Sequence, residues 1–102
     1  MSSIAFDGTK VVLRQERWRH IVLRHPELKN QAQLVLDVVA DPDEVYVDST
    51  GAFHALKRVS GVSDFLVVIY GVKGEGYIRT AYFTSTVRKI RRYKAFKKLK
   101  PS

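Results

Sequence analysis

Two of the three histidines fall within residues 17–28, together with three arginines. Apolar residues at helical spacing predict a helix over residues 15–24, and on it Arg17, His20 and Arg24 share one face. An imidazole gains or loses a proton near neutral pH, whereas arginine stays charged. This pattern is suited to phosphate chemistry, with His20 as the acid or base and the arginines binding the anion.

The second histidine of this segment, His25, has a different setting. It precedes Pro26, which disfavours helical angles at position 25 and predicts a capping or packing role there. His20 and His25 are five residues apart in the sequence. On a continuous helix they would point about 140° away from each other. We therefore predict a chemistry without a metal or a cofactor.

Further candidates come from two predicted strands. In the strand over residues 52–59, Lys57 falls on a mostly apolar face, where a cation is uncommon unless it is paired, snorkelling or functional. The strand over residues 77–84 places hydroxyl groups in a row that can donate hydrogen bonds to phosphate, although Thr and Tyr are also common in strands. These hydroxyl residues, in line with Ile78, are Thr80, Tyr82 and Thr84. Arg79, on the other face, serves a phosphate or faces solvent.

The charge of the chain is segregated. The formal net charge is +8, and within residues 1–87 the acidic and basic residues cancel. A basic block of this kind predicts a polyanionic partner, most often a nucleic acid. The alternative is a solvated cationic helix that aids solubility or docks on an acidic protein. The block consists of Arg88, Lys89, Arg91, Arg92, Lys94, Lys97, Lys98 and Lys100.

The pattern of turns and periodicity predicts an α+β fold in one domain over residues 1–102. A hairpin around Asp7-Gly8 and two helices pack on a four-stranded antiparallel meander, and a basic helix over about residues 86–99 ends the chain. The second helix runs from Pro26 to Val39. In the last helix a narrow apolar stripe includes Val87 and Ile90. The predicted strands of the meander cover residues 44–48, 52–59, 65–70 and 77–84.

Composition excludes several classes of protein. The chain has no cysteine, so disulfides, zinc–thiolate sites and thiol catalysis are excluded. No apolar run approaches the roughly 20 residues of a membrane-spanning helix, and the N-terminus lacks the pattern of a signal peptide. We expect a protein that acts in the cytoplasm, or is delivered into a target cytoplasm, without a membrane partner.

Two strings of the sequence resemble a known family. RWRHIVLRHPEL (residues 17–28) followed by IRTAYFT (residues 78–84) is similar to the phage-associated branch of the Barnase–EndoU–colicin–RelE (BECR) nuclease superfamily. The resemblance spans roughly residues 11–84. It implies a metal-independent ribonuclease, a hydrolase-like toxin or effector, whose helices pack on an antiparallel sheet with an open, RNA-binding face.

The resemblance also implies roles for particular residues. His20 would be the acid or base, Lys57 would stabilise phosphate charge, and Tyr82 and Thr84 would position the phosphate. The leading hypothesis is cleavage of RNA by attack of the 2′-hydroxyl on the phosphate. Two alternatives stay open: a non-catalytic nucleic-acid-binding module, and a toxin-like domain whose basic helix docks an acidic antitoxin or immunity protein. The predicted RNA-binding residues are Arg17, Arg24, Arg79, Arg88, Arg91, Arg92 and Lys94.

Overall fold

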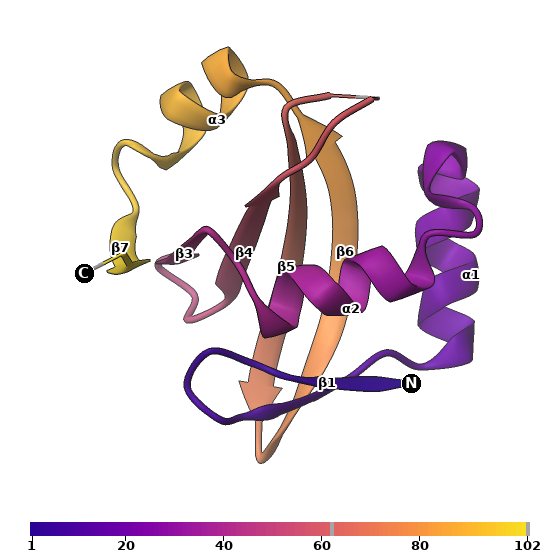
Figure 1. Ribbon diagram of the computed structural model, residues 1–102. Coiled ribbons are helices and arrows are strands. Elements are labelled where there is room, and N and C mark those ends of the chain that lie inside the picture. Colours follow the sequence, from indigo (N-terminus) through magenta and orange to yellow (C-terminus); the bar gives the residue numbers. More distant parts are fainter. Residues whose placement is uncertain (62, 102) are drawn as a thin grey trace.

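The computed structural model describes residues 1–61 and 63–101. They form an α+β fold in which helices lie against one large sheet (Figure 1). The helices are α1 (Gln15–Arg24), α2 (Ala32–Ala40) and α3 (Thr86–Tyr93), with a 3₁₀ turn, η1 (Pro26–Leu28), after α1. The strands are β1 (Ser2–Ile4), β2 (Lys10–Val12), β3 (Glu44–Val47), β4 (Phe53–Arg58), β5 (Phe65–Lys73), β6 (Glu75–Thr84) and β7 (Lys97–Lys100).

The sheet is larger than the sequence predicts. The α+β class is confirmed, but the predicted four-stranded meander, β3 to β6, is only part of a mixed sheet, since the described residues form seven strands in the order β1-β2-β6-β5-β4-β3-β7. The N-terminal hairpin joins the sheet because β2 pairs in parallel with β6, where Val11 lies opposite Gly76. Gly76 permits this close approach, because a Cβ atom there would lie 2.9 Å from the Lys10 carbonyl oxygen.

The C-terminal segment is also different from its prediction. The expected helix over residues 86–99 ends at Tyr93, and β7 pairs antiparallel with β3. Residues 97–100 form a strand and not a helix because they pair with the edge of β3, which would otherwise present unpaired N–H and C=O groups. The narrow apolar stripe predicted for this helix does not lie against the sheet. Val87 and Ile90 are 65% and 58% exposed, and Tyr93 is buried instead.

The predicted second helix is interrupted. Pro26 opens only the short turn η1, and α2 begins at Ala32. Between them Asn30 adopts a left-handed backbone conformation with φ at +67°, which asparagine tolerates better than most residues. The helical run has already ended at Lys29, whose ψ of 133° is extended, and Asn30 continues the break before α2. In the described part of the chain no helix is long and apolar enough to cross a membrane.

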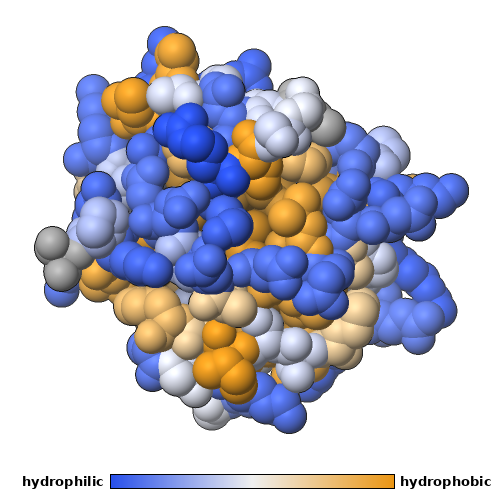
Figure 2. Space-filling view, in the orientation of Figure 1, coloured by the Kyte–Doolittle hydropathy of each residue, from blue (hydrophilic) through white to orange (hydrophobic). Residues whose placement is uncertain are grey.

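The two sides of the sheet are covered unequally. On one side α1, η1 and α2 enclose the main core, which includes Leu28, Val35 and Leu66. Figure 2, viewed from the side of α2, shows apolar surface in the middle of the view, with hydrophilic residues on both sides of it. On the opposite side α3 contributes Tyr93 to a smaller cluster with Tyr46. We call this second side the open face, because α3 covers only part of it.

Gly76→Ala tests how tightly the N-terminal hairpin is joined to β6. We expect a loss of about 1–3 kcal/mol in the free energy of unfolding, because the new methyl group must displace backbone or the Val11 side chain. Urea denaturation measures this loss. Glu75→Ala, at an exposed neighbouring position, removes only a solvent-exposed ion pair with Arg14 and should cost less than about 1 kcal/mol. Equal losses in the two variants would contradict the close pairing.

Candidate nucleic-acid interface

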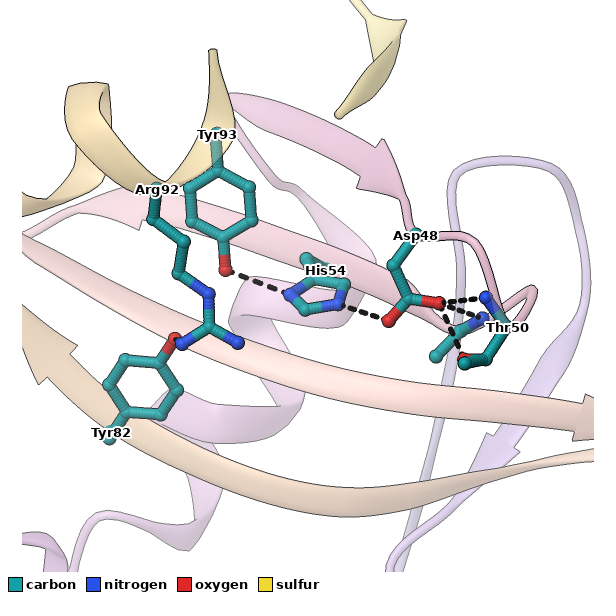
Figure 3. A network of polar contacts seen from close by, with 7 residues as sticks. Asp48, Thr50, His54, Tyr82, Arg92 and Tyr93 are labelled. Carbon is teal, nitrogen blue, oxygen red and sulfur yellow. Dashed lines mark hydrogen bonds and ion pairs between the residues drawn. The ribbon is translucent and has the colours of Figure 1, made fainter. Parts of the chain in front are cut away.

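A row of hydrogen bonds beneath the open face joins α3 to the sheet (Figure 3). The Tyr93 hydroxyl lies 2.8 Å from Nδ1 of His54 on β4, and Nε2 of His54 lies 2.9 Å from Oδ2 of Asp48. His54 and Tyr93 are 2% and 3% exposed. Breaking this Asp48–His54–Tyr93 chain would leave buried polar groups without water as a partner. The chain therefore fixes α3 on the sheet.

The protonation of His54 follows from its surroundings. Burial lowers the pKa of His54; the Asp48 carboxylate opposes this shift, and the positive charges of Arg92 and Arg79 add to it. In the neutral ring, Nε2–H donates to the carboxylate and Nδ1 accepts from the Tyr93 hydroxyl. Burial raises the pKa of Tyr93, which keeps the phenol protonated. Both ring nitrogens are thus occupied within the protein, and His54 has a structural role.

Asp48 also organises the turn between β3 and β4. Its Oδ1 accepts hydrogen bonds from the Thr50 hydroxyl at 2.6 Å, from the Thr50 N–H at 2.9 Å and from the Ala52 N–H at 3.1 Å. Together with His54, these donors, the Thr50 hydroxyl first among them, hold the pKa of Asp48 well below its usual range. Asp48 therefore stays ionised, and its hydrogen bonds hold the turn in one conformation beside the open face.

A pocket of about 560 Å³ lies on the open face beside this chain. Three elements each contribute an arginine to its lining: Arg17 from α1, Arg79 from β6 and Arg92 from α3. We call it the arginine pocket. Asp48 is the single carboxylate among its described lining residues, and His54 is bound to it. The pocket is thus suited to an anion. Its other lining residues are Thr50, Ile69, Tyr77 and Thr80.

A bulge in β6 aims two neighbouring side chains into this pocket. Ile69 of β5 pairs with Thr80, but the next residue of β5 pairs with Ile78, so Arg79 is the extra residue. Arg79 and Thr80 both line the pocket, whereas Ile78 is buried in the main core. The predicted alternation, with Ile78 on the face of Thr80, is therefore wrong, because a bulge shifts the period of two.

A second pocket of about 330 Å³ adjoins the first at Arg92, which lines both. We call it the tyrosine pocket. Nη1 of Arg92 donates a hydrogen bond of 2.6 Å to the Tyr82 hydroxyl, and its guanidinium carbon lies 5.6 Å from the centres of the Tyr82 and Tyr93 rings. Figure 3 shows the Arg92 side chain extending between these two rings. The tyrosine pocket is lined by Tyr82, Phe83, Thr84, Arg88, Arg91 and Arg92.

The structure brings together seven of the residues that the sequence predicts for the site. They are Arg17, Arg79, Arg88, Arg91, Arg92, Tyr82 and Thr84, and they line one or both pockets. Lys57 is not among them. It lies on the other side of the sheet, where its Nζ donates to the Asp41 carbonyl oxygen at 2.8 Å and the Asp41 carboxylate at 3.2 Å. Lys57 therefore does not meet Tyr82, and its pairing with Asp41 accounts for a cation on this mostly apolar face.

His20, Arg24 and Lys94 line neither pocket and are exposed. His20 follows Arg17 by three residues on α1, which turns it about 60° away from Arg17. Ile21, which packs into the core, lies about 40° from Arg17 in the other direction around the helix. His20 therefore points further toward solvent than Arg17 does. Of the three residues on the helix face predicted for phosphate binding, Arg17 alone lines a pocket of the open face, and His20 and Arg24 do not.

Sequence reasoning missed the central members of the interface. His54 has buried neighbours on β4, and its partners Asp48 and Tyr93 lie 6 and 39 residues away. The residue types at positions 48–51 do predict a turn, but no pattern in the sequence indicates that Asp48 and Tyr93 share His54 as a hydrogen-bond partner. No group of three potential metal ligands occurs among the described residues.

His54 predicts a pH-dependent stability. Because its pKa is lower in the folded than in the unfolded protein, the unfolded state binds a proton first as the pH falls. The stabilisation is complete above the unfolded pKa of about 6.5 and is lost as the pH falls through the lower, folded pKa. We expect the free energy of unfolding from urea denaturation to decrease toward about pH 5.5 in the wild type and to decrease less in His54→Gln. Parallel pH profiles would contradict the buried neutral ring.

Comparison with protein-family models, curated proteins and solved structures gives no match.

Proposed function

We propose that this protein binds RNA across the open face, with phosphate groups held by the arginine pocket. The observation that carries the proposal is the convergence of Arg17, Arg79 and Arg92, from three separate elements, on one pocket. Guanidinium groups match phosphate oxygens in geometry and keep their charge at any physiological pH. Three of them without a free carboxylate between them favour an anion with several phosphates.

The aromatic and hydroxyl groups of the open face favour a single strand over a duplex. Tyr77, 41% exposed, lines the arginine pocket, and Tyr82 lines the tyrosine pocket. Unpaired bases stack on such rings, whereas the bases of a duplex are already stacked on each other. Arg88 and Arg91 extend the basic surface along α3. The resemblance to the BECR nucleases favours RNA over DNA.

Metal-independent cleavage of the bound RNA is a second candidate function. The 2′-hydroxyl would attack the neighbouring phosphorus, and the bond to the 5′-oxygen would break, leaving a 2′,3′-cyclic phosphate and a 5′-hydroxyl. Arg79 and Arg92 are placed to stabilise the charge that develops on the phosphate, the role that the resemblance implied for Lys57. The resemblance implies His20 as the acid or base. The observation that favours this function is that Arg17, Arg79 and Arg92 line one pocket together with the hydroxyl residues Thr50 and Thr80.

Arg92→Ala tests the binding surface. Because Arg92 lines both pockets, we expect weaker binding of a fluorescent single-stranded RNA, and a salt dependence of log K reduced by about 1 for one lost phosphate contact. Titrations by fluorescence anisotropy at several salt concentrations measure both quantities.

Arg19→Ala is the matched control for this experiment. It removes the same charge from an exposed position of α1 that lines neither pocket. Arg19 lies about 160° around the helix from Arg17. We expect a smaller loss of affinity. Equal losses in Arg92→Ala and Arg19→Ala would mean that net charge alone attracts the RNA, and the proposed interface would be wrong.

A cleavage assay tests the second candidate function. We expect the wild-type protein to cut single-stranded RNA in the presence of EDTA, with 2′,3′-cyclic phosphate ends, and to leave a 2′-O-methyl RNA intact. Lys57→Ala should still cut, because Lys57 lies on the other side of the sheet and binds Asp41. RNA that stays intact at all pH values and salt concentrations, although it binds, would limit the function to binding.

A further inference from the structure

The three histidines differ in what their ring nitrogens can reach. His54 is 2% exposed, and both of its nitrogens are engaged by Asp48 and Tyr93. His20 is exposed on α1 and turned away from Arg17 toward solvent. His25 combines partial burial, with 31% of its side chain exposed, and a position beside the open face. Of the three, it alone has an imidazole that is both accessible and next to a pocket.

His25 lies against Tyr82. The centres of the two rings are 6.2 Å apart, and the Tyr82 hydroxyl accepts the 2.6 Å hydrogen bond from Arg92. An imidazole, a phenol and a guanidinium group therefore follow one another from the end of α1 across β6 to α3. Tyr82 and Arg92 line the tyrosine pocket, and Arg92 continues into the arginine pocket. His25 stands at the outer end of this row.

The junction between α1 and η1 holds His25 in place. Its N–H donates to the Ile21 carbonyl oxygen at 2.8 Å, and its own carbonyl oxygen accepts from the Leu28 N–H at 3.0 Å. The following Pro26 restricts the backbone further. Glu27 places a carboxylate oxygen 3.5 Å from Nδ1 of the ring. A carboxylate on this side favours the tautomer with the proton on Nδ1 and leaves Nε2 as the basic nitrogen.

We propose that His25, and not His20, is the imidazole that takes the proton from the RNA at this interface. The inference rests on the proposed RNA-binding and cleavage function and specifies its acid–base residue. Nε2 of His25 accepts the proton of the 2′-hydroxyl while the 2′-oxygen forms its bond to phosphorus. The bond from phosphorus to the 5′-oxygen breaks, and the leaving oxygen takes a proton from water. The imidazolium then returns its proton to solvent.

The first arm of the test measures contact without cleavage. A single-stranded DNA oligonucleotide lacks the 2′-hydroxyl and serves as the uncleaved probe. In an NMR titration of the wild-type protein, we expect the ring C–H signals of His25, assigned with the His25→Gln variant, to shift as the probe binds. The signals of His20, assigned with His20→Gln, should shift less. A probe that binds and moves the His20 signals while leaving those of His25 in place would overturn the proposal.

The second arm measures proton transfer. We expect His25→Gln to bind RNA with nearly wild-type affinity but to cut it about 10²–10⁴-fold more slowly, the usual effect of losing a general base. His25→Ala should be partly rescued by imidazole added to the solution, which a merely structural role would not produce. Circular dichroism and probe binding confirm that each variant is folded.

The two arms separate this inference from the function on which it rests. Cutting that persists in His25→Gln but is lost in His20→Gln would overturn the assignment and leave the cleavage function standing. A wild-type protein that binds the probe but cuts no RNA would overturn both the cleavage function and the assignment of His25 as its base. Failure of the wild type to bind either nucleic acid would overturn the interface itself.

Discussion

The Asp48–His54–Tyr93 chain is the interaction on which the open face depends. It crosses the molecule from the β3–β4 turn, through β4, to the last residue of α3. His54 and Tyr93 are buried, so a lost hydrogen bond would leave a polar group of either residue without a partner. Arg92 precedes Tyr93 on α3, and the helix is also held to the sheet by the ion pair of Lys89 with Glu44 at 2.8 Å and by the hydrogen bond of Arg92 itself to Tyr82.

The Asp48–His54–Tyr93 chain also helps to hold three arginines at one pocket of a small protein. Arg17, Arg79 and Arg92 come from a helix, a bulged strand and a second helix, and their mutual repulsion opposes folding. Hydrogen bonds and packing hold the elements together despite this repulsion. A bound anion would offset this repulsion, because opposite charges attract.

Much of the fold could be predicted from local pattern. The bounds of α1 agree with its apolar spacing, and the four strands from β3 to β6 lie within a few residues of their predicted positions. The predictions are wrong where a partner that is distant in the sequence determines the structure of a segment or the role of a residue. Residues 94–99 have a helical composition, but the free edge of β3 makes a strand of Lys97–Lys100. Lys57 looked functional on its apolar face because its partner, Asp41, lies sixteen residues away in the sequence.

The sequence by itself determined the charge of the molecule, the class of its fold and the residue types that could handle phosphate, because these follow from composition and short-range periodicity. Tertiary structure alone decided which of those residues meet. A bulge of one residue turns Arg79 and Thr80 toward the same pocket, and an anchor through His54 sets Arg92 beside Tyr82. Register and buried hydrogen bonds join residues that are far apart along the chain, and no local pattern records such pairings.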